Sequence, residues 1–173
     1  MTDLQGWELK AREQIRDLVA RYNAYGDAGR VAEVLALFAE DAVVEVVGHR
    51  SYRGCDEIGE LFRGTANPEK GRPPKLGKAE RTPSPIWHHT STLVIDVEDP
   101  TLATGRCYFA VLTPRGLDHW GRYRDQYAAV DGGWRFAARS VRVDGMVEGG
   151  WAQHNLRALE SLDGARSSSP DGR

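Results

Sequence analysis

Apolar side chains recur at helical spacing in the first third of the chain. One stripe predicts an amphipathic helix of about five turns that Gly26 could end, and its members are Ala11, Ile15, Leu18, Val19 and Tyr22. A second stripe after Asp27 predicts another helix, and its members are Val31, Val34, Leu35 and Phe38. The β-branched run 42–47 then predicts a strand, and residues 54–62 predict a third short helix.

The pattern changes to short apolar runs in the second half, which predict strands at 88–97, 103–113, 121–130 and 134–143. Short connections rich in Gly, Pro and Asp separate them, so we expect antiparallel neighbours in a meander. Before these strands, residues 64–85 contain five prolines and five Lys or Arg, which predicts a long loop. The sequence leaves open whether this loop is a lid over a site or a disordered insertion.

The order of elements predicts an α+β fold, with helices on one face of a curved antiparallel sheet. A twisted sheet around the long first helix would enclose a conical cavity suited to a small apolar ligand. We expect one domain over residues 1–150. The segment 151–173 is expected to add a short helix, from Trp151 to Leu162, and a frayed tail.

Composition narrows the classes of function. The 173 residues carry a formal net charge of −2, so no large basic field points to nucleic acid. No apolar run approaches the roughly 18 residues of a membrane span, and the N-terminus lacks the pattern of a signal peptide. We therefore expect a cytoplasmic protein, and the predicted cavity makes a small hydrophobic molecule its expected partner. Cys55 and Cys107 fit neither a metal motif nor a disulfide framework.

Two adjacent histidines begin the strand at 88–97. Alternation along the strand groups His89 with Leu93 and Ile95, which favours His89 for the core side. A bulge near Ser91 would turn His88 inward instead. Which histidine faces a pocket therefore stays open on pattern alone.

Asp27 has two interpretations. It stands between the first two predicted helices, where an Asp commonly serves as the N-cap of the following helix. A carboxylate can also orient a histidine and stabilise its imidazolium form, which is the arrangement of many general bases.

Six segments carry a resemblance to a known family: YNAYGDAGR (22–30), LFAEDAVVEV (37–46), YRGCDEI (52–58), HHTST (88–92), ATGRCYF (103–109) and GRYRDQYAAVDGGWRFAAR (121–139). In their order and spacing they resemble the SnoaL-like branch of the nuclear transport factor 2-like (NTF2-like) superfamily. That branch contains scytalone dehydratase, bile-acid 7α-dehydratase and hexachlorocyclohexane dehydrochlorinase. The resemblance implies a cone-shaped α+β barrel that works without a cofactor and assembles as a homodimer or homotrimer.

The resemblance also implies a catalytic site. It pairs Asp27 with His88 and places Tyr22 at the position of a catalytic tyrosine five residues before the aspartate. The second pocket histidine of scytalone dehydratase falls near Thr113 in this chain.

Further residues are candidates for contacts with substrate, namely Tyr25, His89, Phe109, Thr113, Tyr123, Asp125 and Arg139. Tyr123 could donate a hydrogen bond to a substrate oxygen, from a strand face that also carries Asp125. Arg139 could hold an anionic group, although an ion pair with Asp125 is the commoner arrangement. His49, His119 and His154 lie in or near predicted loops without zinc spacing, so we expect no metal.

The expected function is a cofactor-independent lyase of the dehydratase type. An Asp27–His88 dyad would abstract a proton from a small hydrophobic ring that carries a carbonyl, of the polyketide, steroid or terpenoid class. The same groups could serve an isomerase or an aldol cyclase. The fold could equally bind a hydrophobic metabolite without catalysis, or serve mainly in assembly.

Overall fold

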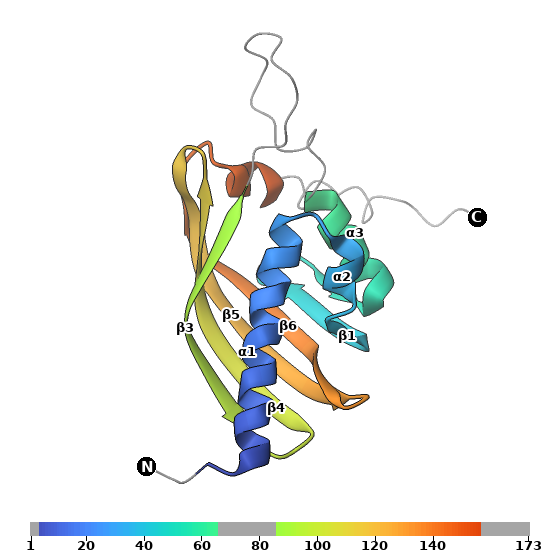
Figure 1. Ribbon diagram of the computed structural model, residues 1–173. Coiled ribbons are helices and arrows are strands. Elements are labelled where there is room, and N and C mark those ends of the chain that lie inside the picture. Colours follow the sequence, from blue (N-terminus) through green and yellow to red (C-terminus); the bar gives the residue numbers. More distant parts are fainter. Residues whose placement is uncertain (1–3, 66–85, 157–173) are drawn as a thin grey trace, which may run out of the picture.

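Helices cover one face of a single six-stranded sheet in the computed structural model, which describes residues 4–65 and 86–156 (Figure 1). The helices are α1 (Gly6–Asp27), α2 (Val31–Leu35) and α3 (Gly54–Thr65). The strands are β1 (Phe38–Val46), β2 (Ser51–Arg53), β3 (Trp87–Val97), β4 (Leu102–Thr113), β5 (Gly116–Val130) and β6 (Gly133–Met146). The predicted α+β fold is confirmed. The strand order β2-β1-β6-β5-β4-β3 leaves β2 and β3 as edges of an open sheet.

The apolar stripe of α1 packs into the curve of the sheet, as its spacing predicts (Figure 1). All five of its predicted members are buried, and Ile15 has no exposed surface. Each large apolar side chain that is buried in this way contributes about 1.5–3 kcal/mol. Packing over residues 11–23 therefore fixes the position of α1 and hence of Asp27 at its C-terminal end.

The predicted meander of β3, β4, β5 and β6 is confirmed, because each strand pairs antiparallel with the next. Strand β1 adds to it by a parallel pairing with β6, and the short β2, which the sequence pattern did not predict, pairs with β1. Strand β5 also begins earlier than predicted, at Gly116. That residue has a φ of 104°, which suits glycine at the tight turn from β4.

The second predicted helix is too long, because it included Phe38. Helix α2 ends at Leu35, and Phe38 is the first residue of β1. The backbone N–H of Phe136 in β6 donates a hydrogen bond to the carbonyl of Leu37, and the rings of Phe38 and Phe136 pack 5.2 Å apart. This contact with a strand about a hundred residues away outweighs the local helical spacing.

A bulge in β3 decides which histidine faces the core side. The pairing of β3 with β4 shifts between Ser91 and Val94, and Thr92 adopts a φ of 54°. Side chains therefore change faces across the bulge. His88 lies on the side of α1, while buried Ile95 returns to the same side beyond the bulge.

The last described segment, residues 151–156, is helical, which fits the start of the helix predicted from Trp151. The remainder of that prediction and nearly all of the predicted loop at 64–85 lie outside the described residues. None of the helices in residues 4–65 and 86–156 combines the length and hydropathy that a bilayer crossing requires.

Candidate active site

Asp27 and His88 meet at the junction of the helical layer and the sheet. One carboxylate oxygen of Asp27, Oδ1, lies 2.6 Å from His88 Nδ1, and the other accepts the backbone N–H of His88 at 2.8 Å. The two side chains retain 17% and 22% of their exposure. Asp27 thus fixes both the strand end and the ring, while leaving the pair within reach of a ligand.

The N-cap interpretation of Asp27 is wrong. Helix α1 runs through Asp27, and Arg30 occupies the cap position before α2. Because both carboxylate oxygens bind His88, no oxygen is used to cap the next helix.

The contact at Nδ1 has a direct chemical consequence. A carboxylate there holds the ring proton on Nδ1, which leaves the Nε2 lone pair of His88 to accept a proton. When Nε2 takes that proton, the same carboxylate stabilises the imidazolium. The arrangement has the parts of a general base.

A second bridge lies one helical turn before the first. Asn23 on α1 is buried, and its side-chain amide donates to the Thr90 hydroxyl at 3.5 Å. Asn23 and Asp27 are four residues apart on the helix, and Thr90 and His88 are two apart on the strand. Both bridges therefore join the same pair of faces.

His119 is the functional candidate that the sequence interpretation missed. It lies in β5 rather than a loop, is buried, and its ring centre is 6.3 Å from that of His88. The register of the strands places the two histidines together, because His88 in β3 lies opposite Val111 in β4, and Val111 lies opposite His119 in β5. A histidine from β5, rather than the position near Thr113, therefore stands beside His88. The alternation that grouped Tyr123 with Asp125 would have found it if extended two residues N-terminal of Gly121.

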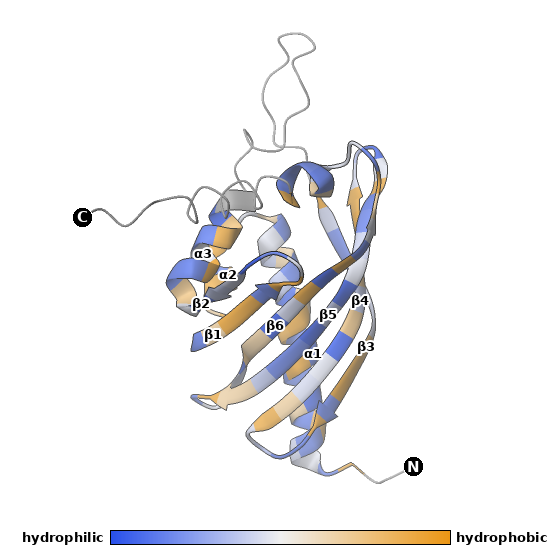
Figure 2. Ribbon diagram, turned by 180° about the vertical axis from the view of Figure 1, so that it is seen from behind, coloured by the Kyte–Doolittle hydropathy of each residue, from blue (hydrophilic) through white to orange (hydrophobic). Residues whose placement is uncertain are grey.

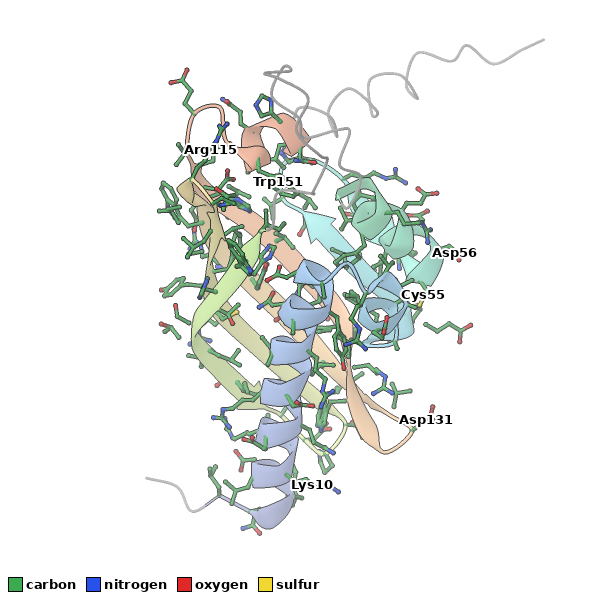
Figure 3. The ribbon with its side chains drawn as sticks, turned by 45° about the horizontal axis from the view of Figure 1, so that its top comes forward. Lys10, Cys55, Asp56, Arg115, Asp131 and Trp151 are labelled. Atoms are coloured by element: carbon green, nitrogen blue, oxygen red, sulfur yellow. The ribbon has the colours of Figure 1, made fainter. Side chains whose placement is uncertain are left out.

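His119 has its own carboxylate partner. Its Nδ1 lies 2.8 Å from Asp118 Oδ1, and Asp118 also accepts the backbone N–H groups of Trp151 at 2.6 Å and Ala152 at 3.0 Å. The Trp151 ring stacks on His119 with centres 5.8 Å apart. Figure 3 shows Trp151 at the end of the molecule where the β4–β5 turn, marked by Arg115, also lies.

The pKa values of this second pair both lie below their usual positions. Burial lowers the pKa of His119, and its hydrogen bond to Asp118 opposes that shift only in part. Burial acts to raise the pKa of Asp118, but hydrogen bonds from Ala152, His119 and Trp151 outweigh it. The geometry and both shifts favour a carboxylate beside a neutral imidazole.

Aromatic side chains continue the site away from the two histidines. The Phe109 ring lies 6.5 Å from His88 and stacks on Tyr123 at 4.6 Å, and Tyr22 lies 6.1 Å from Tyr123. Burial raises the pKa of both tyrosines, so each remains a phenol that can donate a hydrogen bond. Tyr22 is thus connected to His88 through other rings.

Arg139 and Asp125 form a fully buried ion pair. Two guanidinium nitrogens donate to the carboxylate at 2.8 and 2.7 Å, and the Tyr127 hydroxyl donates to it at 2.9 Å. The guanidinium lies 4.0 Å from the centre of the Tyr22 ring. The structure therefore contains the ion pair that the sequence offered as the alternative to anion binding.

Three other candidates lie apart from the Asp27–His88 pair. The Tyr25 hydroxyl accepts a hydrogen bond from exposed Arg21, His89 is exposed, and the Thr113 hydroxyl accepts the backbone N–H of Arg115 in the β4–β5 turn. Among the described residues, no cluster of three or more His, Cys, Asp or Glu side chains is arranged to hold a metal.

The opposite face of the sheet offers a different kind of concavity. None of the described helices lies over the strands there (Figure 2). A groove of about 660 Å³ crosses this face, lined by polar groups that include Glu45, Arg106, Arg124, Gln126 and Ser140. Charged side chains contribute to its lining, and it lacks the aromatic rings that surround His88.

Fold and contacts together define a class of protein, an α+β domain whose helices and curved sheet bring a carboxylate and an imidazole together at one end. The model of the SnoaL-like domain family matches residues 7–140, and the chain belongs to this family. The resemblance found in the sequence is thereby confirmed.

Solved structures with the same fold come from several bacteria. A Novosphingobium aromaticivorans protein, provisionally named a scytalone dehydratase, is 23% identical, with 84% of this chain and 91% of that chain covered and a TM-score of 0.69. A Mycobacterium tuberculosis protein of unknown function is 25% identical, with 86% and 88% covered and a TM-score of 0.67. A type 3 hexachlorocyclohexane dehydrochlorinase from Novosphingobium barchaimii is 17% identical, with 82% and 91% covered and a TM-score of 0.65. No curated protein has a sequence that matches this chain.

Proposed function

We propose that the protein is a cofactor-independent lyase of the dehydratase type, in which Asp27 and His88 form the general base. The observation that carries this proposal is the 2.6 Å contact between the Asp27 carboxylate and His88 Nδ1. The partial exposure of both groups and the aromatic rings beside them support access by a small, largely apolar ring. The substrate class would be a polyketide, steroid or terpenoid that carries a carbonyl.

The reaction begins with proton removal. His88 Nε2 takes a proton from the carbon next to the carbonyl, and the electron pair of the C–H bond forms an enolate. Asp27 stabilises the imidazolium that results, and Tyr123 or Tyr22 donates a hydrogen bond to the enolate oxygen. The enolate then returns to a carbonyl, and its electron pair forms a double bond between the α- and β-carbons. The β-hydroxyl departs with the proton that His88 carries, so that water is the second product.

The magnitudes set what each group has to supply. A positioned general base contributes roughly 10²–10⁴-fold, and removal of one hydrogen-bond donor to a developing oxyanion costs about 10²–10³-fold. The rest of the acceleration comes from holding the acidic carbon against Nε2.

Substitution of the two central residues tests the proposal. A thermal-shift screen of hydroxylated cyclic ketones identifies a ligand, whose conversion is then followed by mass spectrometry. His88→Ala and Asp27→Asn should lower kcat at least about a hundredfold and leave the Kd of the ligand within about tenfold. Asp56→Asn, at an exposed carboxylate on α3, is the matched control and should leave kcat unchanged. Equal turnover by His88→Ala and the parent would exclude His88 as the base.

Isomerisation is a second candidate because it uses the same first step. With a substrate whose carbon–carbon double bond lies β,γ to the carbonyl, proton removal gives a dienolate. The imidazolium of His88 would return its proton to the γ-carbon, so the double bond moves into conjugation and no group leaves. The mass of the product separates the two reactions, since dehydration removes one water and isomerisation leaves the mass unchanged.

A further inference from the structure

We propose that the Asp118–His119 pair is a second ligand-contacting group of the same site, and that His119 Nε2 accepts a hydrogen bond from a hydroxyl group on the bound ring. This inference deepens the proposed function and rests on its premise that a ligand lies beside His88. It adds a substrate feature, a hydroxyl donor close to the acidic carbon, and names the residue that selects for it.

The hydrogen bonds of His119 leave only one atom for a ligand. Nδ1 is engaged by Asp118 at 2.8 Å, so the ring proton lies there and Nε2 carries a lone pair. Within the described residues, the only hydrogen bond of the His119 ring is the one at Nδ1. Nε2 is not among the buried atoms that lack a partner, so it keeps some contact with solvent, and a ligand hydroxyl that replaces water there gains about 0.5–1.5 kcal/mol.

The two imidazoles share a single wall. His88 and His119 meet edge to face with ring centres 6.3 Å apart, and Phe109 lies 6.5 Å from the first and 5.9 Å from the second. They belong to one row of side chains across β3, β4 and β5, so both point to the same side of the sheet. A planar ring that contacts one imidazole is therefore within reach of the other.

The contacts of Asp118 do not require a histidine at position 119. Asp118 accepts the backbone N–H groups of Trp151 and Ala152, so its charge remains hydrogen-bonded without the imidazole. The stacking on Trp151 would be equally well served by a phenyl ring. The imidazole adds an accessible chemistry that neither contact uses, namely the acceptor at Nε2.

The test compares two probes that differ by one hydrogen-bond donor, 2-naphthol and 2-methoxynaphthalene. Isothermal titration calorimetry measures the Kd of each for the parent, His119→Phe, His119→Gln and His88→Gln. We expect the parent to bind 2-naphthol about tenfold more tightly than its ether. His119→Phe should abolish that preference, His119→Gln should retain part of it through its amide oxygen, and His88→Gln should retain most of it.

Several results would overturn the inference. These are a preference that survives in His119→Phe, a preference lost in His88→Gln but not in His119→Phe, and a parent that binds neither probe or does not distinguish them. If His119→Phe fails to fold, the comparison of the parent with His119→Gln decides. The hydrogen bond from the backbone N–H of Trp151 to Asp118 does not involve His119, so we expect His119→Gln to keep it. Because the readout is binding, a normal preference together with full turnover by His88→Ala would sink the proposed catalytic base and leave this inference standing.

Discussion

The carboxylates of Asp27 and Asp125 each bind a basic side chain, and the two pairs differ in position, burial and chemistry. Asp27 and His88 lie at one end of the sheet with 17% and 22% of their side-chain surfaces exposed. Asp125 and Arg139 lie in its centre with none exposed. The first pair contains an imidazole, which has a nitrogen lone pair that can accept a proton, and the second contains a guanidinium, which has none.

The difference teaches how one motif serves chemistry in one place and stability in another. Asp125 receives three hydrogen bonds from Arg139 and Tyr127, and rings of Tyr22 and Tyr123 enclose the guanidinium. Both oxygens of Asp27 bind His88, one at the backbone N–H and one at Nδ1, and Nε2 of that ring remains for a ligand. We therefore expect substitutions at the centre to lower stability and substitutions at the end to lower turnover.

The largest expected loss of stability follows from Asp125→Ala. The substitution leaves the Arg139 guanidinium buried without its counter-charge, which costs about 3–5 kcal/mol. Urea unfolding measures the loss. Asp96→Ala, which breaks an ion pair with Arg106 whose side chains are both more than half exposed, is the matched control and should cost no more than about 1 kcal/mol. Equal losses in the two variants would break the distinction between centre and surface.

The second-largest loss of stability is expected for Asp118→Ala, because this carboxylate connects β5 to the helical segment 151–156. The variant leaves the backbone N–H groups of Trp151 and Ala152 without their acceptor, and the expected loss is about 1–2 kcal/mol. Hydrogen exchange at residues 151–156 should accelerate at the same time. Asp118→Asn keeps an acceptor oxygen and should recover at least half of the loss. Unchanged exchange in Asp118→Ala would contradict the assignment of Asp118 as the group that fastens this helix.

A pH series sharpens the contrast between a titratable pair and a permanent one. Because burial lowers the pKa of folded His119 below its ordinary 6.5, the unfolded chain binds more protons than the folded one below that pH. The contribution of His119 to stability is therefore complete above about pH 6.5 and is lost as the pH falls through the lowered folded pKa. The difference in free energy of unfolding between the parent and His119→Phe should shift in favour of the variant between pH 7 and pH 5. A difference independent of pH would show that His119 titrates alike in both states.

Local patterns predicted the parts of the fold that local periodicity determines. The stripe of α1 and the meander of β3–β6 follow from side-chain spacing and short turns. Phe38 was misplaced because its strand forms through a parallel pairing with β6, which no local window contains. The short β2 was missed for a different reason: it pairs locally with β1, and its three residues are too few to form a recognisable alternating run.

The candidate site shows the same division. Strand alternation alone favoured His89, and only the resemblance to a family brought His88 forward, whereas the bulge at Ser91 supplies the physical reason. His119 was missed because β5 begins before the apolar run from which the strand was predicted. Its position beside His88 also depends on the register of three strands. Such registers arise in the folded molecule and leave only a weak trace in the sequence.

The smallest expected effect belongs to the histidine adjacent to His88. His89 is exposed and, one residue along the strand from His88, points to the face opposite α1. His89→Ala should change kcat less than about twofold and the free energy of unfolding by no more than about 0.5 kcal/mol. The matched change, His88→Ala, removes the same imidazole from the next position and should lower kcat at least about a hundredfold. Its cost in stability should be larger than that of His89→Ala, because it leaves Asp27 Oδ1 without its partner. If His89→Ala instead lost activity and His88→Ala kept it, the strand would present the opposite face to the ligand in solution. The carboxylate of Asp27 would then be a strand anchor through the backbone N–H of His88, and its contact with the ring would have no part in the chemistry.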